Sequence, residues 1–238
     1  MEWAYGVTTV DSRKDSLLPQ TLASLKAGGF GEPVLFVDGA NGGYEGNVVY
    51  RYPRIGAWGN WFLGICELCI RNPRADYYAM FQDDIITYPN LRQYIERSNP
   101  PKDGYLNLFS SPGNESVRPK QIGWFPARKL EGTNSVAYES GLAGQGGKGA
   151  LGLAFSREAL LAFLSHPHCL TKPFEVRFPT MRIDGCVVTA MNKAGWKEYV
   201  HNPSLVQHCG DVSTLRGLVH KQSTTFRGES FDALELLL

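Results

Sequence analysis

The sequence predicts an α/β protein with a mainly parallel, twisted β-sheet that is covered by helices on both faces. Short runs rich in β-branched and aromatic residues alternate along the chain with segments that carry apolar residues at helical spacing. Two strand-like runs, residues 33–37 and 77–81, are continuously apolar, which is typical of central strands buried on both sides. Strands that alternate with helices form parallel sheets, because each helix returns the chain across one face of the sheet.

The first half of the chain gives the clearest pattern. Residues 3–10 predict a strand, residues 16–26 have leucines at helical spacing, and residues 33–37 predict a second strand that ends in an Asp38-Gly39 turn. These three segments form a βαβ unit. The elements expected next are a strand at 47–52, a helix at 60–71, a strand at 77–81, a helix at 90–97 and a strand at 105–109.

Beyond residue 110, glycine and proline interrupt the periodic segments. Six glycines fall between Gly141 and Gly152, too many for a regular element, and we expect a loop there. No linker or internal repeat divides the chain, so we predict one domain over residues 1–238, with a regular part at 1–109 and a loop-rich part at 110–238. In the second part we expect helices at 157–164 and 184–194, followed by segments at 196–200 and 203–209.

Composition excludes several classes of protein. The 238 residues are 43% apolar and 20% charged, which excludes a disordered chain. Lys and Arg number 24 against 23 Asp and Glu, so no overall field favours binding to nucleic acid, and an anion must be bound by a local site. We expect no integral membrane segment, because no apolar run approaches the roughly 20 residues that span a bilayer. Five cysteines, an odd number, favour a reducing compartment, so we expect a cytoplasmic chain, free or peripherally bound to a membrane.

Polar side chains follow three of the predicted strands, where ligands of an open parallel sheet bind. Asp83 and Asp84 repel each other at the end of a buried strand, and a hard divalent cation that offsets this repulsion also binds phosphate oxygens. Two simpler interpretations stay open: Asp38 forms only a turn, and the acidic pair caps the next helix. The strand-end residues are Thr8, Thr9, Asp11, Arg13, Asp38, Asp83 and Asp84.

Two motifs give the chain a resemblance to a known family. Phe81-Gln82-Asp83-Asp84-Ile85 resembles the acidic metal motif of GT-A glycosyltransferases, particularly the Glu-Asp-Asp-Leu form of N-acetylglucosaminyltransferases, with Gln82 at the position of the first acid. The segment from Asn202 to Gly210, continuing to Ser213-Thr214-Leu215, is similar to the part of the N-acetylglucosaminyltransferase IV type that ends in Gln-His-x-Gly and Ser-Ser-Leu. The resemblance implies a GT-A fold, with a nucleotide-binding half at 1–109 and an acceptor and sugar half at 110–238.

The resemblance also implies roles for individual residues. Asp84 and His208 would bind Mn²⁺ or Mg²⁺, and Asp184 would be the base that deprotonates the acceptor hydroxyl in an inverting reaction. Taken alone, His208 is more often a core or surface histidine, and Asp184 serves equally well as a helix N-cap. Asn60 is either a ligand contact or a helix cap. The residues expected to bind the nucleotide sugar are Thr8, Thr9, Arg13, Asp38, Asn60, Asp83 and Gly149, the last from a glycine-rich loop at 144–149 that shapes the sugar pocket.

These roles predict a metal-dependent, inverting glycosyltransferase that moves a sugar, N-acetylglucosamine by resemblance, from a UDP-sugar donor to a hydroxyl of a glycan or another acceptor. Two alternatives stay open. A sugar nucleotidyltransferase should have a glycine-rich, basic loop after the first strand, whereas Asp11 to Asp15 contain no glycine. A non-catalytic carbohydrate-binding relative would explain Gln82. Cys66 and Cys69 form a Cys-x-x-Cys pair within a predicted helix and have no second pair for zinc, so we expect them to pack in the core.

Overall fold

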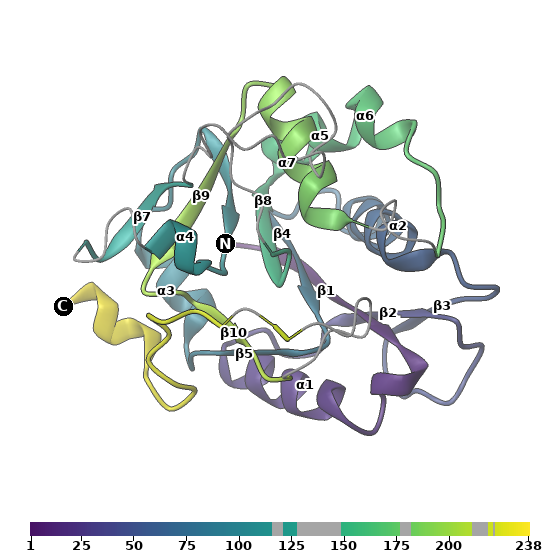
Figure 1. Cartoon of the computed structure of the whole chain (residues 1–238), viewed down its shortest axis with the longest axis horizontal. Helices are drawn as coiled ribbons and strands as arrows, with labels where there is room; N and C mark the ends of the chain where they lie inside the picture. Colours follow the sequence, from purple (N-terminus) through teal and green to yellow (C-terminus); the bar gives the residue numbers. More distant parts are fainter. Residues whose placement is uncertain (116–120, 128–148, 177–181, 211–218, 221) are drawn as a thin grey trace.

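An eight-stranded, twisted β-sheet runs through the centre of the computed structural model (Figure 1), which describes residues 1–115, 121–127, 149–176, 182–210, 219–220 and 222–238. The strand order is β3-β2-β1-β4-β8-β6-β9-β7, and a separate two-stranded sheet pairs β10 with β5. The strands are β1 (Trp3–Val10), β2 (Val34–Asp38), β3 (Val48–Arg51), β4 (Tyr77–Gln82), β5 (Ile85–Thr87), β6 (Gly104–Asn107), β7 (Gly123–Pro126), β8 (Gly152–Ser156), β9 (Lys197–Asn202) and β10 (Val206–His208).

The strand directions confirm the predicted mainly parallel sheet. β3, β2, β1 and β4 are mutually parallel, and β6 is parallel to β9. β8 and β7 run antiparallel to their neighbours. β8 inserts between β4 and β6, so strands from both parts of the chain share one sheet.

Helices cover both faces of the sheet, as predicted (Figure 1). One buried apolar cluster holds Trp58, Trp61 and Phe163 on the side of α2, α5 and α7, and a second holds Leu18, Leu25 and Leu91 on the side of α1 and α3. The helices are η1 (Asp11–Arg13), α1 (Leu17–Ala27), α2 (Gly56–Arg71), α3 (Leu91–Arg97), α4 (Pro112–Glu115), α5 (Arg157–Leu164), α6 (Pro167–Leu170), α7 (Ile183–Lys193) and η2 (Ala233–Leu237).

Two local expectations were wrong, each for a tertiary reason. The expected loop extends through Gly152, but β8 begins at this residue. A Cβ atom on residue 152 would lie 3.0 Å from the ring of Phe81, so a glycine lets the ring pack closely against the strand. α2 begins at Gly56, before Asn60, because the Asp38 carboxylate accepts hydrogen bonds from the N–H groups of Ile55 and Gly56. At the start of α6, the His166 ring accepts a hydrogen bond from the N–H of His168. The glycine-rich residues 141–148 lie outside the described residues.

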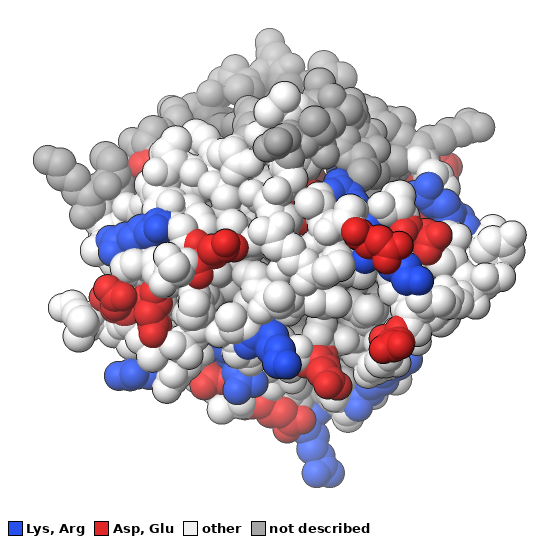
Figure 2. Space-filling model, turned by 90° about the horizontal axis from the view of Figure 1, so that it is seen from below, with Lys and Arg blue, Asp and Glu red and all other residues white. Residues whose placement is uncertain are grey.

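The charged residues on the face seen in Figure 2 are mixed in sign, with Lys and Arg lying among Asp and Glu. This fits the near-balanced overall charge. Cys66 and Cys69 lie in α2, have free thiols and pack against the apolar cluster of α2, α5 and α7. Within the described ranges, no helix is both long and apolar enough to cross a bilayer.

His201, in β9, is a fully buried histidine. Its Nδ1 donates to the carbonyl of Pro203 at 2.7 Å, and its Nε2 accepts from the Tyr94 hydroxyl at 2.5 Å. This arrangement holds the neutral ring. Burial lowers the pKa of His201 to about 4, from an ordinary value near 6.5.

We expect this histidine to make the protein less stable in weak acid. Between about pH 6.5 and pH 4 the unfolded chain binds a proton at His201 and the folded chain does not, so the free energy of unfolding falls as the pH falls, by about 3 kcal/mol in total. Urea unfolding of the wild type and of His201→Gln across this range measures the effect. The variant should lose this part of the pH dependence, and parallel profiles would contradict the assignment.

Candidate functional site

The candidate site lies at the carboxyl ends of three parallel strands. β1 is flanked by β2 on one side and by β4 on the other, so the chain order reverses at β1. In open α/β sheets such a reversal leaves a crevice at the strand ends, because the helices that follow the strands lie on opposite faces. A pocket with about 620 Å³ of empty space lies there. Its lining includes Thr8, Thr9 and Val10 from β1, Asp38 from β2, Gln82 from β4, and Arg54, Ala57, Asn60, Asp83, Asp84, Ile183 and His220.

The small sheet of β5 and β10 brings Asp84 and His208 together. These strands are antiparallel, with His208 opposite Ile85, and the N–H of Cys209 donates to the carbonyl of Asp84 at 2.9 Å. Asp84 immediately precedes β5, and His208 ends β10. Two residues far apart in the sequence therefore lie side by side at the edge of the pocket, which Asp84 lines and His208 does not.

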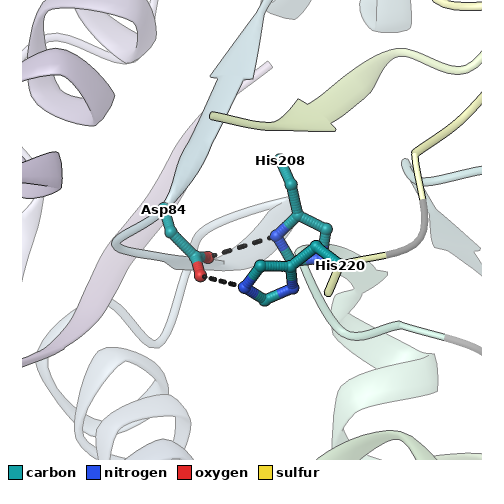
Figure 3. A group of neighbouring side chains, drawn as sticks. All are labelled: Asp84, His208 and His220. Atoms are coloured by element: carbon teal, nitrogen blue, oxygen red, sulfur yellow. Dashed lines mark ion pairs between the residues drawn. The ribbon is translucent and has the colours of Figure 1, made fainter. Parts of the chain in front are cut away.

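A second histidine, His220, completes a cluster around the Asp84 carboxylate (Figure 3). His208 Nδ1 lies 3.6 Å from Oδ1 of Asp84, and His220 Nε2 lies 3.4 Å from Oδ2. The two imidazole rings stack with their centroids 3.7 Å apart. The side chains of Asp84, His208 and His220 are 7%, 9% and 11% exposed, and one ligand atom from each lies within 4.8 Å of the others.

This cluster fits a divalent metal ion. Among the described residues, the buried atoms Oδ1 of Asp84 and Nδ1 of His208 make no hydrogen bond and have only their own 3.6 Å contact. Such atoms are costly to bury unless a cation satisfies them. One carboxylate and two imidazoles suit Mn²⁺, Fe²⁺ and Zn²⁺. Burial alone would raise the pKa of Asp84, but its contact with His208 and the nearby His220 and Arg13 lower it, so the carboxylate is ionised and ready to bind a metal.

Sequence reasoning missed His220. It lies outside both motifs that carried the family resemblance, and its segment has no periodic pattern. The available signal was weak: His220 is one of five histidines in the chain, and it follows the histidine of the C-terminal motif by twelve positions. The structure brings Asp84 and His208 together as that resemblance implied, and it adds His220.

Asp83 and Asp84 lie in different surroundings. Asp83 accepts a hydrogen bond from the Thr9 hydroxyl at 2.7 Å and lines the pocket. Burial, together with the charge of Asp84, raises the pKa of Asp83 to about 6. The two adjacent carboxylates are therefore not equivalent: Asp84 joins the two histidines, and Asp83 faces the pocket beside β1.

Asp38 and Asn60 both line the pocket, and both also hold backbone in place. The carboxylate of Asp38 accepts from the N–H of Ile55 at 2.8 Å, from the N–H of Gly56 at 3.2 Å and from Nε of Arg54 at 3.3 Å. Asn60 lies within α2, and its side-chain amide donates to the carbonyl of Phe36 at 2.7 Å. The cap of α2 is therefore Asp38, from β2, and not Asn60, the cap that the sequence suggested.

Arg13, Gly149 and Asp184 lie beside the pocket and are not among the residues that line it. Arg13 is buried and lies 3.5 Å from Oδ2 of Asp84. Asp184 is in the first turn of α7, directly after the pocket residue Ile183, and it accepts from the N–H of Gly149 at 3.2 Å and of Gly185 at 2.8 Å. Gly149 has φ +83°, and a Cβ atom there would lie 2.8 Å from the Phe109 ring, so a glycine is required. Residues 144–148 of the expected sugar loop lie outside the described part of the chain.

No protein-family model matches this chain, and no curated protein matches it. Among solved structures, the catalytic domain of Drosophila β1,4-galactosyltransferase 7 in complex with xylobiose aligns over 99% of this chain and 79% of its own, with 14% identity and a TM-score of 0.48. GalNAc-T7 with UDP, GalNAc and Mn²⁺ aligns over 92% of this chain at 13% identity, with a TM-score of 0.49, and this chain spans 45% of it. CMP-2-keto-3-deoxy-manno-octonic acid synthetase in complex with CTP aligns over 84% of this chain and 89% of its own, with 11% identity and a TM-score of 0.42. These similarities are distant, and the function proposed below rests on the site.

Proposed function

We propose that this chain is a metal-dependent glycosyltransferase that uses a UDP-sugar. The observation that carries the proposal is the position of the cluster of Asp84, His208 and His220. It adjoins a pocket at the point of an α/β sheet where ligands bind, and two of its buried atoms, Oδ1 of Asp84 and Nδ1 of His208, make no hydrogen bond to the described residues and have only their own 3.6 Å contact. A cation bound by the cluster would lie beside the pocket. At that position it would neutralise the negative charge of the diphosphate of a nucleotide sugar.

Mn²⁺ is the ion that we assign to Asp84, His208 and His220, with Mg²⁺ as the alternative. The mixed carboxylate and imidazole donors favour Mn²⁺, because Mg²⁺ prefers oxygen ligands. When bound, the metal supplies a Lewis acid that neutralises the charge developing on the leaving diphosphate.

The chain's own residues supply the other functions. We assign the polar side chains of Thr8, Asp38 and Asn60, which line the pocket, to binding of the nucleoside, and Asp83 to contact with the sugar. Asp184 is assigned as the base that removes the proton of the acceptor hydroxyl in an inverting transfer, because it lies in the first turn of α7 next to the pocket. The acceptor is a glycan or another hydroxyl compound. N-acetylglucosamine as the donor sugar rests on the resemblance of residues 81–85 and 202–210 to N-acetylglucosaminyltransferases.

A nucleotidyltransferase is the less favoured enzyme. Between β1 and α1 the chain forms the short helix η1 (Asp11–Arg13), which has no glycine and so lacks the flexible loop that would wrap a triphosphate. A carbohydrate-binding relative without catalysis would have no use for the cluster of Asp84, His208 and His220.

Calorimetric titration with UDP, in the presence of Mn²⁺ and after chelation, tests the proposal. We expect UDP to bind with Mn²⁺ and at least about 10-fold more weakly without it, since a metal held by the cluster would neutralise the charge of the diphosphate. Hydrolysis of UDP-N-acetylglucosamine and of other UDP-sugars then identifies the donor. UDP binding that is unaffected by chelation would contradict the metal assignment. Turnover of a nucleoside triphosphate with a sugar phosphate would favour the nucleotidyltransferase, and binding of free glycan without UDP would favour the carbohydrate-binding relative.

A further inference from the structure

One buried hydrogen-bond network ties together the two segments that carry the histidines of the cluster. His208 ends β10, and His220 lies three residues before Ser223. The side-chain oxygen of Gln207 accepts from the N–H of His208 at 3.2 Å and from the N–H of Ser223 at 3.0 Å. The side-chain nitrogen of Gln207 donates to the carbonyl of Ser223 at 2.9 Å. The amide of Gln207 thus joins the two segments in the way that a backbone peptide joins paired strands.

The carboxylate of Glu115 binds the segment that follows His220. Glu115 ends α4, is 4% exposed, and its carboxylate accepts hydrogen bonds from residues 223–225. The donors are the hydroxyl of Ser223, the N–H and hydroxyl of Thr224, at 3.1 and 2.7 Å, and the N–H and hydroxyl of Thr225, at 3.2 and 2.8 Å. Burial alone would raise the pKa of Glu115, but these bonds lower it. The buried carboxylate is therefore ionised and satisfied by the segment that follows His220.

We propose that Glu115 and Gln207 are positioning residues for the candidate metal site: they hold the segment after His220 so that its imidazole lies against His208 and Asp84. The inference rests on one part of the proposed function, namely that the cluster binds a metal. Neither residue belongs to the cluster itself, so each acts through a histidine. Glu115 acts through His220, whereas Gln207 also contacts the backbone of His208.

Mn²⁺ affinity of the full chain, measured from the electron paramagnetic resonance signal of free Mn²⁺, separates positioning from general stability. We expect Glu115→Gln to weaken Mn²⁺ binding by about 10- to 100-fold, as is usual when a group that orients a metal ligand is removed. In the His220→Ala background the same change should have less than about a 2-fold effect, because the ligand that Glu115 positions is already gone. Gln207→Ala should weaken binding in both backgrounds.

Ser156→Ala is the matched control. It removes the N-cap of α5, whose hydroxyl accepts from the N–H of Ala159, and should lower stability without changing Mn²⁺ affinity. If Glu115→Gln fails to fold, Thr224→Val removes a single hydroxyl donor to Glu115 and should give a smaller loss that is again absent with His220→Ala. Unchanged affinity in Glu115→Gln, or an equal loss in both backgrounds, would overturn the inference.

Hydrogen exchange tests the positioning role of Glu115 independently of metal binding. If the wild type binds no Mn²⁺, the proposed function fails, and the positioning role is still measurable at the N–H groups of Ser223, Thr224 and Thr225. These should exchange faster in Glu115→Gln while the strands of the central sheet keep their protection. Exchange at Ser223, Thr224 and Thr225 that matches the wild type would overturn the positioning role in either case.

Discussion

Asp84→Asn should weaken Mn²⁺ binding by more than about 100-fold and remove the Mn²⁺-dependent part of UDP binding. Loss of a directly coordinating carboxylate exceeds the 10- to 100-fold effect that is typical of outer-shell partners. The change also leaves Arg13 buried without its carboxylate partner, which should destabilise the metal-free protein by about 3 kcal/mol. Mn²⁺ titration and urea unfolding measure the two effects.

Two further variants make this result specific. Asp103→Asn removes the same charge from an exposed carboxylate that pairs with Lys197, and it should change neither metal binding nor stability by more than about 1 kcal/mol. His208→Gln removes a ligand without removing a negative charge, so it reports on metal binding if Asp84→Asn does not fold. Tight Mn²⁺ binding by a folded Asp84→Asn or His208→Gln would refute the metal site.

The sheet and most of its elements could be predicted from the sequence because local patterns determine them. β1 and β2 coincide with runs of β-branched and aromatic residues, and α5 with the predicted range at 157–164. The start of α2 could not be predicted, since its cap is the Asp38 side chain from a different strand. The start of β8 could not be predicted for a similar reason. Its first residue is a glycine, and the need for a glycine there follows from its packing against Phe81.

The residues of the candidate site could likewise be predicted only in part. Asp83 and Asp84 could be found because they follow a buried strand, and strand ends meet at a defined edge of the sheet. His220 could not be found, because its position depends on a segment without regular structure that donates hydrogen bonds to Glu115 and is bonded to the side chain of Gln207. The non-equivalence of the two carboxylates is likewise tertiary, since it depends on the histidines that approach Asp84 and the Thr9 hydroxyl that binds Asp83.

Asp184→Asn should lower the rate of sugar transfer by about 100- to 10,000-fold, the range expected for loss of a general base, while Mn²⁺ and UDP bind as in the wild type. The variant should fold. One oxygen remains to accept from the N–H of Gly185, and the hydrogen bond lost to Gly149 costs about 1 kcal/mol. Transfer from the UDP-sugar to an acceptor, with UDP binding measured on the same samples, gives both readouts.

The base assignment requires that Asp184→Asn lowers sugar transfer without weakening UDP binding. Both must be measured because Asp184 also holds the backbone of Gly149 beside the pocket. If Asp184 only shaped that backbone, its loss would weaken donor binding together with turnover, and a variant that binds UDP normally would transfer sugar normally. Glu158→Gln is the matched control: it removes an exposed carboxylate from the first turn of α5, with the same small loss of favourable interaction with the helix dipole. Glu158→Gln should keep full activity. Transfer by Asp184→Asn at a tenth of the wild-type rate or faster would exclude Asp184 as the base, since a missing base costs at least about 100-fold.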